Sequence, residues 1–297
     1  MKSTKNVVVL GKFDGVHIGH SRLICKAMET GRQHDMQIVV YVIGFAKDKV
    51  ITDDDEKEQI LKSMGADKVI FRSLDLKLKN MSPEDFVRHV LLAELNSAYV
   101  IVGRNFRFGK ERCGDSHMLT TICKDYGIKV YVIDTVRMLS PLGVMEDVSS
   151  TAVRNYISDG KVDYAAKYLG RPYSIKGTVT SGKHLGRKLG FPTINIYPPE
   201  SFLDMKNGVY ASLICIDGTE YKAITNVGLN PTVEYKKDVI TETHILDADI
   251  DCYGKEAEIK FIKFIRSEKC FESMQELSMQ IKSDMEEVKK YWDEIPL

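Results

Sequence analysis

The first 135 residues alternate between short apolar runs and amphipathic segments. Runs rich in β-branched residues predict strands over 6–11, 37–45, 67–73, 98–103 and 128–134. Apolar residues at three- and four-residue spacing predict helices over 20–33, 53–65, 82–96 and 116–127. This alternation is typical of a parallel α/β sheet covered by helices on both faces, in which ligands bind beyond the carboxyl ends of the strands.

The pattern changes after residue 148. Two short helical segments are followed by β-rich or alternating runs over 173–182, 208–217, 221–228, 240–249 and 256–265, which predict an antiparallel β-barrel. The last amphipathic segment, 271–292, predicts a terminal helix whose apolar stripe packs on the barrel. We therefore expect one domain over 1–155, a helical linker over 156–172 and a second domain over 173–297.

Composition narrows the class of protein. The 42 Lys and Arg residues balance 42 Asp and Glu residues, which argues against a general nucleic-acid binder. Six cysteines without a C-x-x-C pair indicate reduced, mostly buried thiols. The longest apolar stretch, "MQIVVYVIGFA", is too short to cross a membrane, and the N-terminal apolar run is too short for a signal peptide. We expect a cytoplasmic protein that binds neither nucleic acid nor membrane.

The stretch "GKFDGVHIGH", residues 11–20, joins the first predicted strand to the first helix. A glycine-rich turn before a helix N-terminus suits a phosphate. His17 and His20 fall on one helix face, where they can hydrogen-bond a phosphoryl oxygen while a nucleotide α-phosphate is attacked. Histidines that only cap the turn would look the same, and no third ligand for a metal is evident.

Two further stretches of the first domain carry candidate chemistry. In "VSSTAVR", residues 148–154, hydroxyls at a helix start precede Arg154, which suits a pyrophosphate or, equally, an ordinary capped helix with a surface Arg. In "VGRNFRFG", residues 102–109, Asn105, Phe106 and Phe108 combine a polar group with aromatic surface for a flat ring. Two core phenylalanines would give the same pattern.

The second domain contains "SGKHLGRKLGFPTINI", residues 181–196. Its glycines permit close approach to phosphates, although glycines alone would also fit a hairpin. Thr193 and Asn195 point to the same side of an extended segment and offer hard oxygen ligands for Mg²⁺. Farther on, "ETHILD" begins with Glu242, which taken alone is an ordinary solvated strand residue.

Taken together and in order, these stretches resemble the bacterial bifunctional riboflavin kinase/FAD synthetase family. The first is similar to its H-x-G-H nucleotidylyltransferase signature, and 181–196 is similar to its kinase signature, with "NGVYA" and "NVGLNPT" as companions. The resemblance covers the whole chain. It implies a Rossmann-like α/β nucleotidylyltransferase domain and an antiparallel riboflavin kinase barrel with a terminal helix. Its implied activities are phosphorylation of riboflavin to FMN with ATP and Mg²⁺, and adenylylation of FMN to FAD with release of pyrophosphate.

The resemblance also implies roles for residues of the adenylyltransferase domain. His17 and His20 would stabilise the transition state, while Asn105, Phe106 and Phe108 would bind the flavin. The residues implied to bind ATP and its phosphates are Gly11, Phe13, Asp14, Gly15, Gly19, Ser149, Ser150, Thr151 and Arg154.

In the kinase domain the resemblance makes Glu242 the catalytic base, with His244 structural. The residues implied to bind ATP are Gly182, Gly186, Arg187, Gly190, Pro192, Thr193 and Asn195, and Thr193 and Asn195 would also hold the metal. The implied partners are small molecules, flavin and ATP, and the implied assembly is a monomer or weak homo-oligomer.

One segment departs from the family. The usual T-F-x-P-H-P motif reads "IGFAKDK" at 43–49, where Phe45 is kept but Lys47, Asp48 and Lys49 replace Pro, His and Pro. This change leaves open a chain that retains only riboflavin kinase activity. A non-catalytic flavin or nucleotide sensor is a further alternative, although a sensor needs neither the histidine pair nor Glu242.

Overall fold

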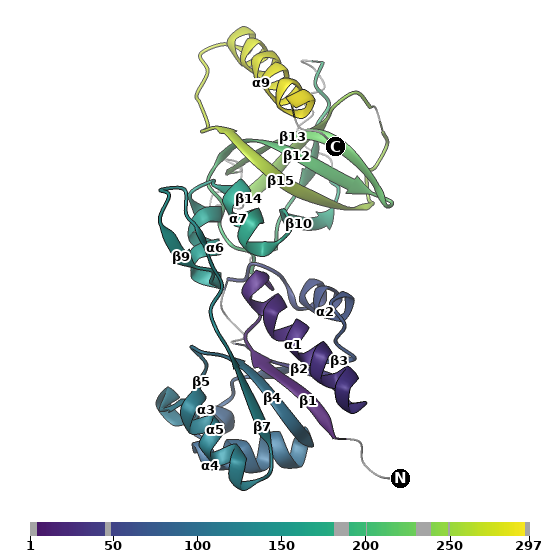
Figure 1. Ribbon diagram of the computed structural model, residues 1–297. Coiled ribbons are helices and arrows are strands. Elements are labelled where there is room, and N and C mark those ends of the chain that lie inside the picture. Colours follow the sequence, from purple (N-terminus) through teal and green to yellow (C-terminus); the bar gives the residue numbers. More distant parts are fainter. Residues whose placement is uncertain are drawn as a thin grey trace. The chain divides into compact units, whose positions relative to one another are not determined.

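The computed structural model describes residues 5–44, 49–180, 190–199, 201–229, 239–248 and 250–294. The chain forms two compact units, Met1–Ser150 and Thr151–Leu297, and each is described by itself (Figure 1).

The first unit is built on a five-stranded parallel sheet in the order β3-β2-β1-β4-β7. Its strands are β1 (Asn6–Gly11), β2 (Gln37–Gly44), β3 (Lys68–Ser73), β4 (Ser97–Gly103) and β7 (Lys129–Ile133). All five strands predicted from the sequence are confirmed. The strand order reverses between β1 and β4, so a ligand site is expected beyond the ends of these two strands.

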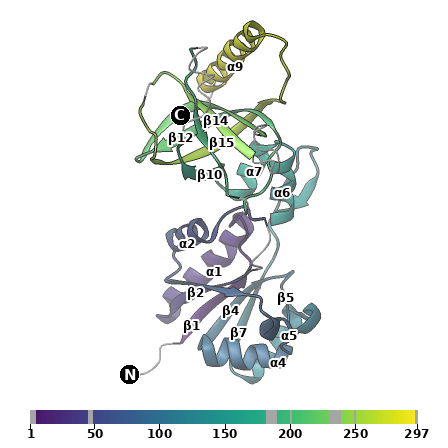
Figure 2. The same cartoon turned by 180° about the vertical axis from the view of Figure 1, so that it is seen from behind.

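Helices cover both faces of this sheet, as the alternating pattern predicts (Figure 2). One face carries α1 (Ile18–His34) and α2 (Asp54–Ser63). The other carries α3 (Leu76–Lys79), α4 (Pro83–Asp85), the π-helix η1 (Phe86–Glu94) and α5 (Ser116–Asp125). Val7 and Val9 of β1 pack into the first core, whereas Val8 and Leu10 pack into the second. Burial on both faces explains the unbroken apolar run of this strand.

The sequence pattern does not reveal the small elements of this unit. They are β5 (Arg107–Phe108), the 3₁₀ turn η2 (Lys110–Arg112), β6 (Gly114–Asp115), β8 (Arg137–Leu139) and β9 (Met145–Asp147). Elements of two or three residues are too short to show a period. The helix predicted over 82–96 is present, with most of its length wound as a π-helix.

The second unit contains a six-stranded antiparallel sheet in the order β10-β15-β12-β13-β14-β11. Its elements are α6 (Ser150–Ser158), which begins at the boundary, α7 (Val162–Leu169), β10 (Tyr173–Thr178), β11 (Ile194–Ile196), β12 (Gly208–Ile216), β13 (Thr219–Leu229), β14 (Val239–Ile245), β15 (Glu256–Arg266) and α9 (Met274–Glu294). A bridge between Thr180 and Asn195 joins the chain after β10 to β11. The two outer strands therefore approach each other, and the sheet curves into the predicted barrel.

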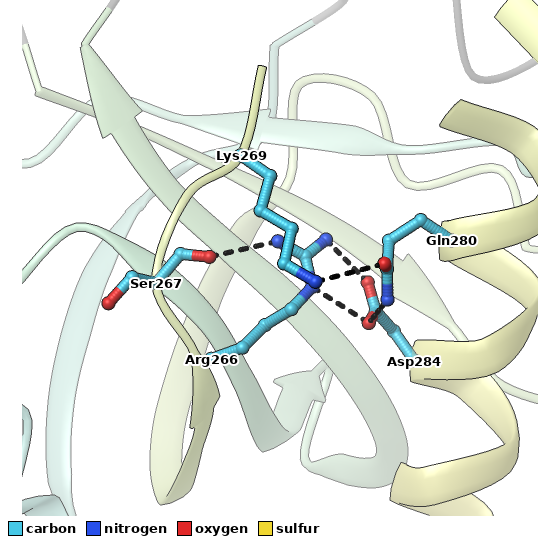
Figure 3. A network of polar contacts seen from close by, with 5 residues as sticks. All are labelled: Arg266, Ser267, Lys269, Gln280 and Asp284. Carbon is cyan, nitrogen blue, oxygen red and sulfur yellow. Dashed lines mark hydrogen bonds and ion pairs between the residues drawn. The ribbon is translucent and has the colours of Figure 1, made fainter. Parts of the chain in front are cut away.

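The terminal helix packs on this sheet as its apolar stripe predicts. Val288 and Trp292 of α9 lie in one core cluster with Val209 and Ala211 of β12. A polar network adds a second connection between sheet and helix (Figure 3). Nε and Nη2 of Arg266 donate to the two carboxylate oxygens of Asp284 at 2.8 and 2.6 Å, and Asp284 is only 3% exposed.

The structure bears on the state of the cysteines, on membrane-spanning helices and on the domain limits. All six cysteines are free, but Cys25, Cys113 and Cys270 are exposed, so the expectation of mostly buried thiols is wrong for half of them. Among the described residues, none of the helices combines the length and apolar composition that crossing a bilayer requires. The compact units divide at residues 150 and 151, whereas the domain limits expected from the sequence remain predictions.

Candidate active sites

The turn between β1 and α1 is strained and firmly held. Phe13 and Val16 adopt positive φ angles of 51° and 42°, which are unfavourable for large or β-branched residues. The carboxylate of Asp14 accepts a hydrogen bond from the N–H of Ile51 at 3.0 Å, and its carbonyl accepts one from the Ser150 hydroxyl at 2.9 Å. Asp14 therefore stabilises the turn through these two hydrogen bonds. Its contact with a phosphate stays a prediction.

The two histidines of this turn lie against each other at the start of α1. His17 is the N-cap, and its Nδ1 accepts a hydrogen bond from the N–H of His20 at 3.4 Å. The two rings stack with centroids 3.7 Å apart. A Cβ atom at Gly19 would lie 3.0 Å from the His17 ring, so this position leaves no room for a side chain unless the ring moves.

Burial keeps both histidines uncharged at neutral pH. It lowers the pKa of His17 to about 4, although the nearby Asp14 carboxylate opposes part of the shift. Burial also lowers the pKa of His20 well below its usual value, and a proton on His17 and the positive charge of Lys57 act in the same direction. Because Nδ1 of neutral His17 accepts a hydrogen bond, the ring proton resides on Nε2. His17 can thus donate an N–H to a phosphoryl oxygen without carrying a charge.

The loop after β4 lies at the same edge of the sheet, since β1 and β4 are neighbouring parallel strands. Asn105 is exposed there, and its Oδ1 folds back toward Gly103. Phe106 is partly buried and stacks on Phe108, whose side chain is buried in the core. The structure therefore gives Phe108 a packing role, and its contact with a flavin stays a prediction.

The remaining predicted phosphate-binding residues fall in three places. Gly11 ends β1, where a Cβ would approach the Phe13 ring to 3.0 Å. Ser149 and Ser150 lie at the start of α6, and the Ser150 hydroxyl is engaged with Asp14. Thr151 and Arg154 of α6 belong to the second compact unit. Phosphate binding by all of them stays a prediction, as it does for Gly15.

In the second unit, strand register places three polar residues side by side. Asn195 of β11 is opposite Glu242 of β14, and Glu242 is opposite Asn226 of β13. Residues opposite one another in neighbouring strands point to the same face of the sheet. Glu242 is exposed between the two amides. Asn195 and Glu242 are candidate site residues from the sequence, whereas Asn226 is visible there only as the first residue of "NVGLNPT"; the pairing of β13 with β14 reveals its place beside Glu242.

The residues predicted to hold Mg²⁺ fit a hard cation. Asn195 is 3% exposed, and its Oδ1 is buried without a hydrogen-bond partner among the described residues. A buried amide oxygen normally has a partner, and a cation can provide one. Thr193 precedes Asn195 by two residues and is half-buried.

His244 supports the segment that carries these ligands. Its Nδ1 lies 2.7 Å from the carbonyl oxygen of Pro192, and its ring meets the Phe191 ring edge-on at 6.1 Å. This contact suits the structural role expected for His244.

Several predicted residues lie outside the described part of the chain. They are Gly182, Gly186 and Arg187 of the kinase segment, and Phe45, Lys47 and Asp48 of the altered segment. Gly190 is described and has a φ of 85°, a conformation that favours glycine.

The first unit is a parallel α/β unit with a buried histidine pair at the turn after its first strand, and the second is a β-barrel with a carboxylate between two amides. This is the combination expected of the ATP-dependent transferases that the sequence motifs resemble. Comparison with known proteins specifies it further. A family model for FAD synthetase matches residues 1–152, and one for riboflavin kinase matches residues 169–292. The chain therefore belongs to the bifunctional riboflavin kinase/FMN adenylyltransferase family, and the resemblance inferred from its motifs is confirmed.

Individual relatives cover nearly the whole chain. The bifunctional riboflavin kinase/FMN adenylyltransferase of Buchnera aphidicola subsp. Schizaphis graminum is 32% identical over 98% of this chain and 95% of its own length. The Escherichia coli K12 protein of the same name is 33% identical over 94% and 90%. A crystal structure from Streptococcus pneumoniae, titled a macrolide-efflux protein, has a TM-score of 0.86 at 26% identity and covers 97% of this chain and 95% of its own.

Proposed function

We propose that this chain makes FAD from riboflavin in two successive steps. The barrel unit transfers the γ-phosphoryl group of ATP to riboflavin and gives FMN and ADP. The α/β unit transfers AMP from a second ATP to FMN and gives FAD and pyrophosphate. The observation that carries this proposal is the match of both enzyme families to one chain, FAD synthetase over residues 1–152 and riboflavin kinase over residues 169–292. This double match favours neither a chain that retains only riboflavin kinase activity nor a non-catalytic sensor.

In the kinase step, Glu242 takes the proton from the 5′-hydroxyl of the ribityl chain. The hydroxyl oxygen then bonds to the γ-phosphorus as the bond from that phosphorus to the β–γ bridging oxygen breaks. Thr193 and Asn195 are the residues that would hold Mg²⁺, which when bound neutralises charge on the transferring phosphoryl group. Asn226, which is opposite Glu242 in the neighbouring strand, is proposed to orient the substrate hydroxyl. Gly182, Gly186, Arg187, Gly190 and Pro192 complete the proposed ATP-binding segment.

In the adenylyl step, a phosphate oxygen of FMN attacks the α-phosphorus of ATP and pyrophosphate leaves. His17 and His20 act as uncharged hydrogen-bond donors to the α-phosphoryl oxygens, beside the positive end of the α1 dipole. Ser149, Ser150, Thr151 and Arg154 are proposed to bind the departing pyrophosphate. Asn105, with Phe106 and Phe108, is proposed to receive the flavin.

The setting of these reactions follows from the same proposal. Flavin and ATP are the partners, no nucleic acid takes part, the protein acts in the cytoplasm, and it is a monomer or weak homo-oligomer. The balance of 42 basic and 42 acidic residues is in keeping with small-molecule substrates.

The proposal is tested by separating the two activities within the full chain. Glu242→Gln removes the base and should lower the rate of riboflavin phosphorylation by about 100-fold or more, while FMN adenylylation stays unchanged. Glu220→Gln is the matched control, because Glu220 is a carboxylate of β13 paired with Lys260 and should leave both rates unchanged. Full kinase activity in Glu242→Gln would remove Glu242 from the proposed mechanism.

A further inference from the structure

Residues 49–57, which lead into α2 and form its first turn, make a wall beside the histidine turn. The N–H of Ile51 donates to the Asp14 carboxylate at 3.0 Å, which fastens this segment to the β1–α1 turn. Ile51 and Thr52 are both buried. The wall is therefore fixed to the turn that carries His17.

Two polar groups of this wall are poorly satisfied within the described residues. The hydroxyl oxygen of Thr52 is buried and has no hydrogen-bond partner there. Lys57, on the first turn of α2, has a side chain only 7% exposed, and its ammonium lies 2.8 Å from the carboxylate of Asp54. That carboxylate is 69% exposed, so it is a mostly hydrated partner for a buried cation.

The Lys57 ammonium also lies over the Phe71 ring, 5.7 Å from its centre, but this contact and the ion pair with Asp54 do not fully account for a buried lysine. Pairs three residues apart on a helix contribute little, whereas taking an ammonium out of water is costly. The ammonium has three N–H donors, and a buried cation of this kind usually faces an anion.

Lys57 also acts electrostatically on the histidine pair. Its positive charge helps to lower the pKa of His20, after burial and the charge of His17. The Nδ1 atom of His20 is likewise buried without a hydrogen-bond partner among the described residues. Thr52, His20 and Lys57 thus present a hydroxyl, an imidazole nitrogen and an ammonium within the part of the unit proposed to bind ATP.

We propose that Lys57 binds the polyphosphate of ATP in the adenylyl step, with the Thr52 hydroxyl as a second contact from the same wall. This inference rests on the proposed adenylyltransferase function of the first unit. It gives the first unit a cation of its own for the phosphates, since α2 lies within that unit.

The experiment uses the full chain with FMN, ATP and Mg²⁺. Lys57→Met keeps the length of the side chain and removes its charge, and it should raise the KM for ATP in FAD formation at least about tenfold. Lys57→Arg should recover part of the loss. Riboflavin phosphorylation by the same preparation should be unchanged, which shows that the chain is folded in its other unit.

Lys62→Met is the matched control. Lys62 lies on the same helix, is 53% exposed and pairs with Glu58, so its loss should change neither activity. A wild-type KM for ATP in folded Lys57→Met overturns the inference. If Lys57→Met does not fold, Thr52→Val is measured instead, because valine has the shape of threonine without the hydroxyl. An unchanged KM for ATP in Thr52→Val would then overturn the proposed phosphate contact of the wall. Failure of the unmodified chain to form FAD refutes the proposed function and this inference together.

Discussion

At the scale of single residues, the first site depends on keeping polar groups uncharged in a buried place. His17 and His20 stack beneath a turn whose Phe13 and Val16 adopt strained angles. Such strain costs about 1–3 kcal/mol per residue and persists where the surroundings fix it, here through hydrogen bonds that Asp14 accepts from Ile51 and Ser150. The turn is thereby preorganised before ATP binds.

The low pKa of His17 predicts that acid destabilises the first unit. Between pH 6.5 and 4 the unfolded chain binds a proton that folded His17 does not, so stability is full above pH 6.5 and falls as the pH decreases through this window. At pH 5 the loss due to His17 is about 2 kcal/mol. Denaturant unfolding at pH 7 and pH 5 should therefore show a larger loss in the unmodified chain than in His17→Asn, which keeps a capping side chain. Equal losses in the two proteins would contradict the assignment.

Gly19 offers a steric test of the histidine pair. In Gly19→Ala the new Cβ would stand 3.0 Å from the His17 ring and push it out of place. We expect FAD formation from FMN to slow by about tenfold or more, because a misplaced transition-state donor loses most of its effect. Riboflavin phosphorylation serves as the internal control. An unchanged rate of FAD formation would mean that the ring position is unimportant.

The sequence predicts the individual residues of these sites unevenly. The His17–His20 pair and Asn195 are visible because they lie in short local motifs. The role of Lys57 is not visible, and Asn226 stands in the quoted motif "NVGLNPT" without its partner being evident, because both depend on neighbours distant in the sequence. Burial of Lys57 contradicts the usual preference of lysine for the surface, and no pattern in its helix indicates it.

At the scale of elements, the periodicity of apolar residues predicts the long, regular helices and strands. The five parallel strands and the terminal helix are found where the pattern places them. The β8–β9 hairpin and the π-helical winding of η1 are not anticipated, because short elements and local hydrogen-bond shifts leave no period. The row of Asn195, Glu242 and Asn226 is set by strand register, which hydrophobic alternation alone does not specify between strands far apart in sequence.

The connection between β15 and α9 gives a prediction at this scale. Arg266 and Asp284 form a buried pair with two hydrogen bonds, and Gln280 donates a third to the carboxylate (Figure 3). Asp284→Asn leaves the guanidinium without its counter-charge and should cost about 3–5 kcal/mol of unfolding free energy.

Asp247→Asn is the control for this variant. It breaks the exposed pair with Lys289 and should cost at most about 1 kcal/mol. Both values come from denaturant unfolding followed by far-ultraviolet circular dichroism. Similar losses in the two variants would show that the buried pair does not hold the terminal helix to the barrel.

At the scale of the whole molecule, two unrelated folds occur in one chain, and the product of one proposed reaction is the substrate of the other. The family match of the first unit extends across the altered segment at 43–49, so that change does not remove the unit from its family. The sequence shows that residues 47–49 differ from the family motif, but only an activity assay shows whether the first unit still accepts FMN.

The most direct measurement follows the flavins made by the unmodified, purified chain. Riboflavin and FMN would be incubated separately with ATP and Mg²⁺, and the products separated by chromatography. The account predicts that riboflavin yields FMN and then FAD, and that FMN yields FAD with equimolar pyrophosphate. Accumulation of FMN without FAD, under both oxidising and reducing conditions, would contradict it and leave a riboflavin kinase with an inactive first domain.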